Sequence, residues 1–155
     1  HRDGLSDRLP RMLGTQAAGA APLVEGAPVK NPETIATAIR IGAPVSHPRA
    51  RREIELSNGL VARVTEAELL EAAALANRHG LAICPNSAVA LAAAGKLRRE
   101  GSIGRDETVV VVATAHAIKF SGSAVRYHGS RARLANPPRS LPATLEAVIG
   151  ALGEG

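Results

Sequence analysis

Hydrophobic positions divide the chain into short apolar runs separated by longer amphipathic stretches. The runs at 11–16 and 60–64 have the length of strands, and turn residues follow each of them. A run with four consecutive valines at 108–113 is apolar on both sides of an extended chain, which is typical of a central strand in a parallel sheet. The run at 81–84 predicts one more short, buried strand.

Amphipathic stretches with helix-start and helix-end residues fill the intervals between these runs. Thr65 and Glu68 have the spacing of a capping box, so a helix is predicted from this point to a stop at Gly80. Asn31, as a cap followed by a proline, predicts another helix that ends at Gly42. Further helices are predicted after Ser46 to Leu56, from a cap at Asn86 or Ser87 to Gly101, and over 143–152.

Alternation of strands and helices favours an α/β fold with a layered, mainly parallel sheet flanked by helices. A length of 155 residues suits one domain, residues 1–155, with the 108–113 strand near the middle of the sheet. Residues 121–155 contain many turn residues and are expected to form a wrapped tail with a terminal helix. The chain starts at a histidine with a polar stretch, which suggests processing or the rear part of a longer protein.

Composition narrows the possible partners. The net charge is +5, but the basic residues are scattered and only Phe120 and Tyr127 could stack on bases, so no nucleic-acid partner is expected. A single cysteine, Cys84, cannot form an internal disulfide, which indicates a reducing compartment. No Cys/His spacing predicts a metal site, and no apolar run is long enough for a membrane span, so neither partner is expected.

Residues that directly follow predicted strands are the candidates for chemistry, because ligands of α/β sheets bind outside the carboxyl ends of the strands. Thr114, His116 and Lys119 place a hydroxyl, an imidazole and an amine within six positions. From the residue types alone, a hydrogen-bonded strand end explains them as well as a ligand site does. Three segments of this kind are 16–22, 84–87 and 114–119, and within them 17–21, 84–87 and Thr114 are expected to converge on one side of the sheet.

Four motifs spread over most of the chain carry a family resemblance. They are Gln-Ala-Ala-Gly-Ala-Ala-Pro at 16–22, Thr-Ile-Ala-Thr-Ala-Ile-Arg-Ile-Gly at 34–42, Pro-Asn-Ser-Ala-Val-Ala-Leu at 85–91 and Thr-Ala-His-Ala-Ile-Lys at 114–119. In this order they resemble the carboxyl-terminal half of threonine synthase, a pyridoxal-phosphate (PLP) enzyme family of the tryptophan-synthase-β-like fold. The chain departs from the family at Ala117, where glycine is usual.

The resemblance implies PLP as the cofactor and, for the complete enzyme, conversion of O-phosphohomoserine and water to threonine and phosphate. It implies that Thr114 forms a hydrogen bond with the pyridine nitrogen of the cofactor. His116 would fix the loop, and Lys119 would be a motif lysine without a catalytic role. No catalytic residue and no metal ligand are therefore assigned. Cys84 is interpreted as a packed side chain, and Asn86 and Ser87 as helix caps.

What the chain lacks is equally informative under this resemblance. The family's cofactor-binding lysine and its phosphate-binding loop belong to the amino-terminal half, and none of the three lysines, Lys30, Lys96 and Lys119, has a matching setting. The isolated chain is therefore expected to be inactive. The implied partners are the small-molecule substrate and the amino-terminal half, within a homodimer, in the cytoplasm or, in a plant, the plastid.

Two alternatives remain open. The chain could come from another PLP lyase of the same fold, such as a threonine or serine dehydratase, although those enzymes usually set Ser or Cys where Thr114 stands here. It could also be a stand-alone binding module without catalysis. The upstream coding sequence distinguishes these readings, because only the enzyme needs the lysine and the phosphate loop there.

Overall fold

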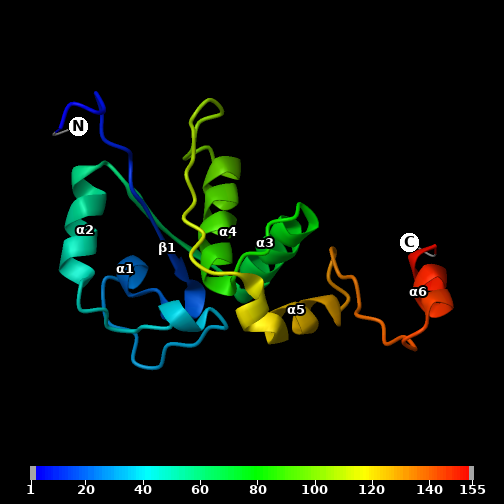
Figure 1. Ribbon diagram of the computed structural model, residues 1–155. Coiled ribbons are helices and arrows are strands. Elements are labelled where there is room, and N and C mark those ends of the chain that lie inside the picture. Colours follow the sequence, from blue (N-terminus) through cyan, green and yellow to red (C-terminus); the bar gives the residue numbers. More distant parts are fainter. Residues whose placement is uncertain (1–2, 154–155) are drawn as a thin grey trace.

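The computed structural model describes residues 3–153, so the first two residues of the polar start and the last two of the predicted tail lie outside the description (Figure 1). The strands are β1 (Leu13–Ala17) and β2 (Leu60–Val64). The α-helices are α1 (Pro22–Glu25), α2 (His47–Leu56), α3 (Glu66–Arg78), α4 (Pro85–Arg99), α5 (Ser121–His128) and α6 (Leu145–Leu152). Three 3-10 helices, η1 (Ala18–Ala20), η2 (Thr37–Ile39) and η3 (Ala117–Phe120), complete the order.

The two strands form a parallel sheet in which Leu13 lies opposite Leu60 and Ala17 opposite Val64. Parallel neighbours need a long crossover, and the segment between the strands, which includes α1 and α2, provides it. The predicted α/β class, a parallel sheet with flanking helices, is confirmed.

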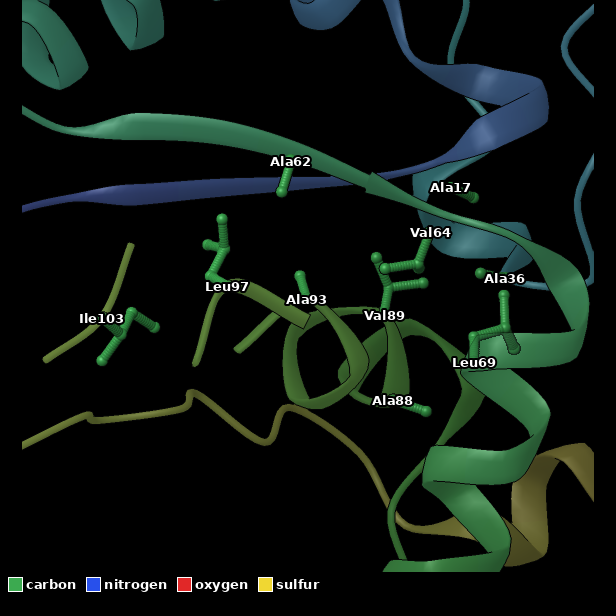
Figure 2. Packing of buried hydrophobic residues seen from close by; sticks show 10 residues of the cluster. All are labelled: Ala17, Ala36, Ala62, Val64, Leu69, Ala88, Val89, Ala93, Leu97 and Ile103. Carbon is green, nitrogen blue, oxygen red and sulfur yellow. The ribbon is translucent and has the colours of Figure 1, made fainter. Parts of the chain in front are cut away.

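The core lies between this sheet and α4, which crosses one face of it (Figure 2). Val89 and Leu97 of α4 lie on the side of the helix that faces Ala62 and Val64 of β2. Leu69 of α3 is fully buried at the edge of the same cluster. Alanines make up much of the remainder, so helix and sheet approach closely and burial of many small side chains replaces an aromatic core.

Local signals define α3 as predicted. The Thr65 hydroxyl accepts a hydrogen bond from the Glu68 N–H at 3.2 Å, and the Glu68 carboxylate accepts one from the Thr65 N–H at 2.7 Å. Both halves of the capping box are therefore present. After the helix, Gly80 has a φ of +80°, a conformation that glycine adopts without the strain of a side chain. The predicted strand at 60–64 and the helix to Leu56 are also confirmed.

The helix predicted between Asn31 and Gly42 is wrong, because this segment is a loop with only the short η2 turn. Its backbone groups bind partners elsewhere in the molecule. The Ile35 N–H donates to the Glu66 carboxylate at 3.1 Å, and the Ala38 N–H donates to the Asn86 side-chain oxygen at 3.2 Å. These tertiary hydrogen bonds take the place of the helical ladder.

The strand predicted at 108–113 is also wrong: the segment is extended, but it pairs with no strand among residues 3–153. Most of its side chains are exposed, 84% for Val110 and 71% for Val112. A central strand needs a neighbour on each side, and the only two strands in the described part of the chain pair with each other. The apolar pattern of this segment is thus that of a buried strand, although the described part of the chain leaves most of its side chains exposed.

Two smaller predictions need correction as well. The segment 81–84 forms only an isolated antiparallel bridge, between Ile83 and His116. The cap of α4 is Cys84 and not Asn86 or Ser87, because the Cys84 sulfur accepts the Ser87 N–H at 3.4 Å. A proline at the first helical position then continues the helix from this cap.

Residues after η3 form α5, which contacts α3, and a chain that leads to α6. Tyr127 is the buried residue of α5, and its hydroxyl accepts the Leu134 N–H at 3.3 Å. Thr144 caps α6 by accepting the Ala147 N–H. In Figure 1, α6 lies apart from the sheet and α4. Among residues 3–153, no helix combines the length and apolar character that crossing a membrane requires.

Candidate functional site

The candidate site lies where the chain after α4 returns to the beginning of that helix (Figure 1). At the far end of α4, the Arg98 guanidinium donates to the carbonyls of Gly104 and Arg105. Near the beginning, the Cys84 N–H donates to the Ala115 carbonyl at 3.0 Å. The returning segment is thus fixed to α4 at both ends, and its second end brings Thr114 to the helix N-terminus.

Thr114 forms a cluster with two residues of the first turn of α4. Its N–H donates to the Ser87 hydroxyl at 2.9 Å, and the two hydroxyl oxygens are 3.3 Å apart. The Cys84 sulfur lies 3.2 Å from the Ser87 hydroxyl and 4.0 Å from the Thr114 hydroxyl. Cys84 and Ser87 are buried, whereas Thr114 is exposed. The exposed Thr114 hydroxyl is thus held in place by the buried polar side chains of Ser87 and Cys84, which form its polar support.

The electrostatics of this cluster come from neutral groups. Burial alone raises the pKa of the Cys84 thiol, but hydrogen bonds from the Ser87 hydroxyl and N–H, then from Thr114 and Asn86, outweigh burial and lower the pKa below its ordinary value. No carboxylate or cation is among these causes. The N-terminus of α4 adds the partial positive charge of the helix dipole.

The side chains of His116 and Lys119 form no hydrogen bond with this cluster. The His116 ring nitrogen Nδ1 accepts the Ile118 N–H at 3.1 Å and so caps η3. Lys119 lies on the exposed side of the same short helix. Lys96 donates to the Arg63 carbonyl at 3.2 Å, on the sheet side of α4.

The turn that follows β1 lies at the same end of the sheet, and it reaches the cluster through the 33–38 loop. The Gly19 carbonyl accepts the Glu33 N–H at 2.9 Å, and Asn86 accepts the Ala38 N–H from the other side of this loop. A Cβ atom on Gly19 would lie 2.1 Å from the Glu33 carbonyl oxygen. The small residue of this turn therefore serves close packing of two backbone segments.

Direct hydrogen bonds join two of the predicted segments, 84–87 and Thr114. The segment 16–22 is linked to them only through the 33–38 loop, which bonds to Gly19 and to Asn86. Sequence reasoning missed the role of Ser87, which it interpreted as a helix cap. The available signal was a small polar residue two positions after the proline at the helix start. No pattern in the chain linked it to Thr114, because the two residues are 27 positions apart.

Only Thr114 gives the cluster an exposed side. A cavity of about 480 Å³ lies elsewhere, between α3 and the segment at 133–136, and Thr114 is not among its lining residues. Within residues 3–153, no three His, Cys, Asp or Glu side chains gather as a metal site would require. The exposed Thr114 hydroxyl, in neutral surroundings, suits a ligand nitrogen that accepts or shares one hydrogen bond.

Comparison with known proteins gives a consistent family. Residues 2–115 match the family described as pyridoxal-phosphate dependent enzyme. The chain is 44% identical over 165 aligned positions to threonine synthase 2, chloroplastic, of Arabidopsis thaliana, covering 97% of this chain and 32% of that protein. It is 46% identical over 132 positions to threonine synthase of Methanocaldococcus jannaschii, covering 79% and 33%. For threonine synthase of Mycobacterium leprae the values are 48% over 127 positions, 81% and 35%. The chain thus spans about a third of the length of these curated relatives.

Proposed function

Because the chain belongs to the family of pyridoxal-phosphate dependent enzymes, we propose that it is the part of a threonine synthase that contacts the pyridine ring of the cofactor. The complete enzyme would convert O-phosphohomoserine and water to threonine and phosphate. Thr114 would be the residue of this chain that binds the ring nitrogen. The observation that carries the proposal is an exposed hydroxyl held on a buried, neutral support.

The residues present fit this part of PLP. A ring nitrogen needs a hydrogen-bonding partner, and the Thr114 hydroxyl can donate one hydrogen bond without carrying a charge. When bound, PLP supplies the electron sink that makes the substrate's carbon atoms reactive. The chain's own contribution is then to orient the ring through Thr114, while His116 keeps the following loop in place by capping η3.

We propose an amino-terminal part of the same enzyme as the partner that carries the lysine and the phosphate loop. The extended segment 108–113 supports this, since Val110 and Val112 are largely exposed although their pattern is that of a buried strand. Ile118, which follows this segment in the sequence, is 76% exposed as well. Strands of the partner paired along this segment would satisfy its backbone, and partner elements packed on the faces of that sheet would cover these side chains.

A homodimer of the complete enzyme and a location in the cytoplasm or a plastid also belong to this proposal. The relative from Arabidopsis thaliana, which is named as chloroplastic, supports the second possibility. A dehydratase is the weaker candidate, because Thr114 occupies the place of its usual Ser or Cys. A binding module without catalysis would have no lysine or phosphate loop encoded upstream.

A phosphate-release assay with O-phosphohomoserine and PLP tests the function. The 155-residue chain alone is expected to release no phosphate. Coexpression with the segment encoded directly upstream is expected to give phosphate and threonine in equal amounts. The Thr114→Val variant of this assembled enzyme removes the hydrogen bond at nearly constant shape, and its turnover is expected to fall at least about tenfold.

Other outcomes would contradict the proposal in distinct ways. Ammonia and a keto acid in place of phosphate and threonine would indicate a dehydratase. Saturable turnover by the chain alone that is lost in Lys119→Ala would show that the cofactor lysine lies in this chain. An upstream sequence without a lysine and a phosphate loop would leave the binding module as the function.

A further inference from the structure

The first half of the 33–38 loop is anchored to the body of the molecule. The Glu33 N–H donates to the turn after β1, and the Ile35 N–H donates to the Glu66 carboxylate of α3. Ala36 is fully buried and belongs to the core cluster. This half of the loop therefore has fixed neighbours in the sheet and in α3.

The second half of the loop is held to another element by a single side chain. Thr37 and Ala38 are exposed, and the Ala38 N–H donates to the Asn86 side-chain oxygen of α4 at 3.2 Å. Among residues 3–153, the other hydrogen bonds between backbone groups of 37–40 stay within 35–41. The position of the exposed 37–38 turn relative to α4 thus depends on Asn86.

The same bond fixes the orientation of the Asn86 amide. A backbone N–H can only donate, so the side-chain oxygen of Asn86 must face Ala38 and its NH2 group must point elsewhere. That NH2 group donates to the Cys84 sulfur at 3.7 Å. One side chain therefore bonds both to the exposed turn and to the polar support of Thr114.

We propose that Asn86 is a positioning residue of the cofactor site, which holds the 37–38 turn beside the polar support of Thr114 so that a ligand bound at Thr114 also meets this turn. The inference rests on the proposed function, since Thr114 must be the residue that meets the ring. Thr37 and Ala38 have small side chains, which leave room for a flat ring to approach the turn. Asn86 needs no contact with the ligand, because it acts through the turn.

Loss of the Asn86 side chain is expected to affect ligand binding more than folding. One hydrogen bond at an exposed turn contributes little net stability, because water can take the place of the lost partner. A turn that moves freely must instead be ordered again whenever a ligand binds to it. That entropic cost lowers the affinity for the ligand.

The test compares Asn86→Ala, Asn86→Asp and Thr114→Val in the enzyme assembled with its upstream segment. Its readouts are the PLP dissociation constant and the hydrogen exchange of the Ala38 amide before PLP is added. Asn86→Ala is expected to accelerate this exchange about tenfold and to weaken PLP binding about fivefold. Asn86→Asp keeps an acceptor for the Ala38 N–H, in a first helical turn that favours negative charge, and is expected to restore both.

Ser57→Ala is the control for a general loss of stability. The Ser57 hydroxyl also joins distant segments, since it accepts the Met12 N–H at 3.1 Å. This variant is expected to lower the melting temperature as much as Asn86→Ala does, without changing the Ala38 exchange or the PLP affinity. If Asn86→Ala does not assemble, Asn86→Ser takes its place with the same expected results, because the shorter side chain cannot reach both partners.

The outcomes separate this inference from the proposed function. If Thr114→Val weakens PLP binding and Asn86→Ala accelerates only the Ala38 exchange, the positioning role is overturned and the proposed function stands. If neither variant weakens PLP binding, Thr114 does not meet the ring and both are overturned. If Ser57→Ala weakens PLP binding as much as Asn86→Ala, or if Asn86→Asp restores the exchange but not the affinity, the positioning role is again overturned.

Discussion

At the scale of single residues, small side chains determine how this molecule is built around its candidate site. Ser87 fits within the first turn of α4 and still reaches the backbone of Thr114. Gly19 permits two backbone segments to touch, because its carbonyl accepts the Glu33 N–H and no Cβ lies between them. A larger residue at Gly19 would displace the neighbouring segment. The packing around the candidate site therefore depends on small residues.

Substitution Gly19→Ala tests this packing. The new Cβ would lie 2.1 Å from the Glu33 carbonyl oxygen, which belongs to backbone and cannot rotate away. We expect a loss of about 1 to 3 kcal/mol in the free energy of unfolding, measured by urea denaturation. Gly122→Ala is the control, since a Cβ there meets nothing within 4 Å, and it is expected to be neutral or slightly stabilising. Equal stability of the two variants would contradict the close approach.

At the scale of secondary structure, elements with a local start signal formed where the sequence predicts them. The capping box of Thr65 and Glu68 begins α3 within its own first turn, so it needs no distant partner. The loop between Asn31 and Gly42 shows the opposite case. Its cap and proline also favour a helix, but bonds to Glu66 and Asn86 hold the backbone in another form. A local signal therefore decides the structure only when tertiary partners do not compete.

The capping box predicts a specific pH dependence of stability. The backbone N–H of Thr65 is the main cause that lowers the pKa of Glu68 below its ordinary value of 4.5; burial opposes it, and the Thr65 hydroxyl, Lys96 and Arg99 add to it. Because the folded state has the lower pKa, the stabilisation is present above the unfolded value and is lost as pH falls through the folded value. Glu68→Gln is thus expected to cost about 0.5 to 1 kcal/mol at neutral pH and progressively less below pH 4.5.

Thermal unfolding of the wild type and Glu68→Gln from neutral to acidic pH measures this difference. The control is Glu55→Gln, which removes an exposed ion pair with Arg51 on the surface of α2. Such a surface pair contributes little, so this variant is expected to match the wild type at neutral pH. A stability difference for Glu68→Gln that stayed constant down to acidic pH would exclude the carboxylate as its source.

At the scale of the whole molecule, this chain buries fewer apolar side chains than its sequence pattern predicts. The sheet has two strands, the core consists largely of alanines, and the valine-rich segment remains uncovered in residues 3–153. The polar support of Thr114 is nevertheless complete within the chain. The cluster around Thr114 is thus built from residues of this chain, while the surface along 108–113 is where the proposed amino-terminal part would bind.

Substitution Val112→Asp tests whether that surface binds the proposed amino-terminal part. A buried, unpaired carboxylate opposes association, so we expect the affinity for the upstream segment to fall at least about tenfold. The fold of the chain itself is expected to be unchanged, since Val112 is 71% exposed without the partner. Val45→Asp is the control, because Val45 is 99% exposed in a loop outside this segment. Analytical ultracentrifugation of the mixed segments measures both, and equal binding by both variants would place the interface elsewhere.

The sequence by itself determined the α/β class, β2, α3 and the family, because these depend on periodicity, on capping residues and on motifs within a few positions of each other. Only the tertiary structure decided that 31–42 is a loop, that 108–113 stays unpaired and that Ser87 supports Thr114. Each of these depends on contacts between residues far apart in the chain. Such contacts compete with local preferences, and their presence or absence cannot be derived from neighbouring residues alone.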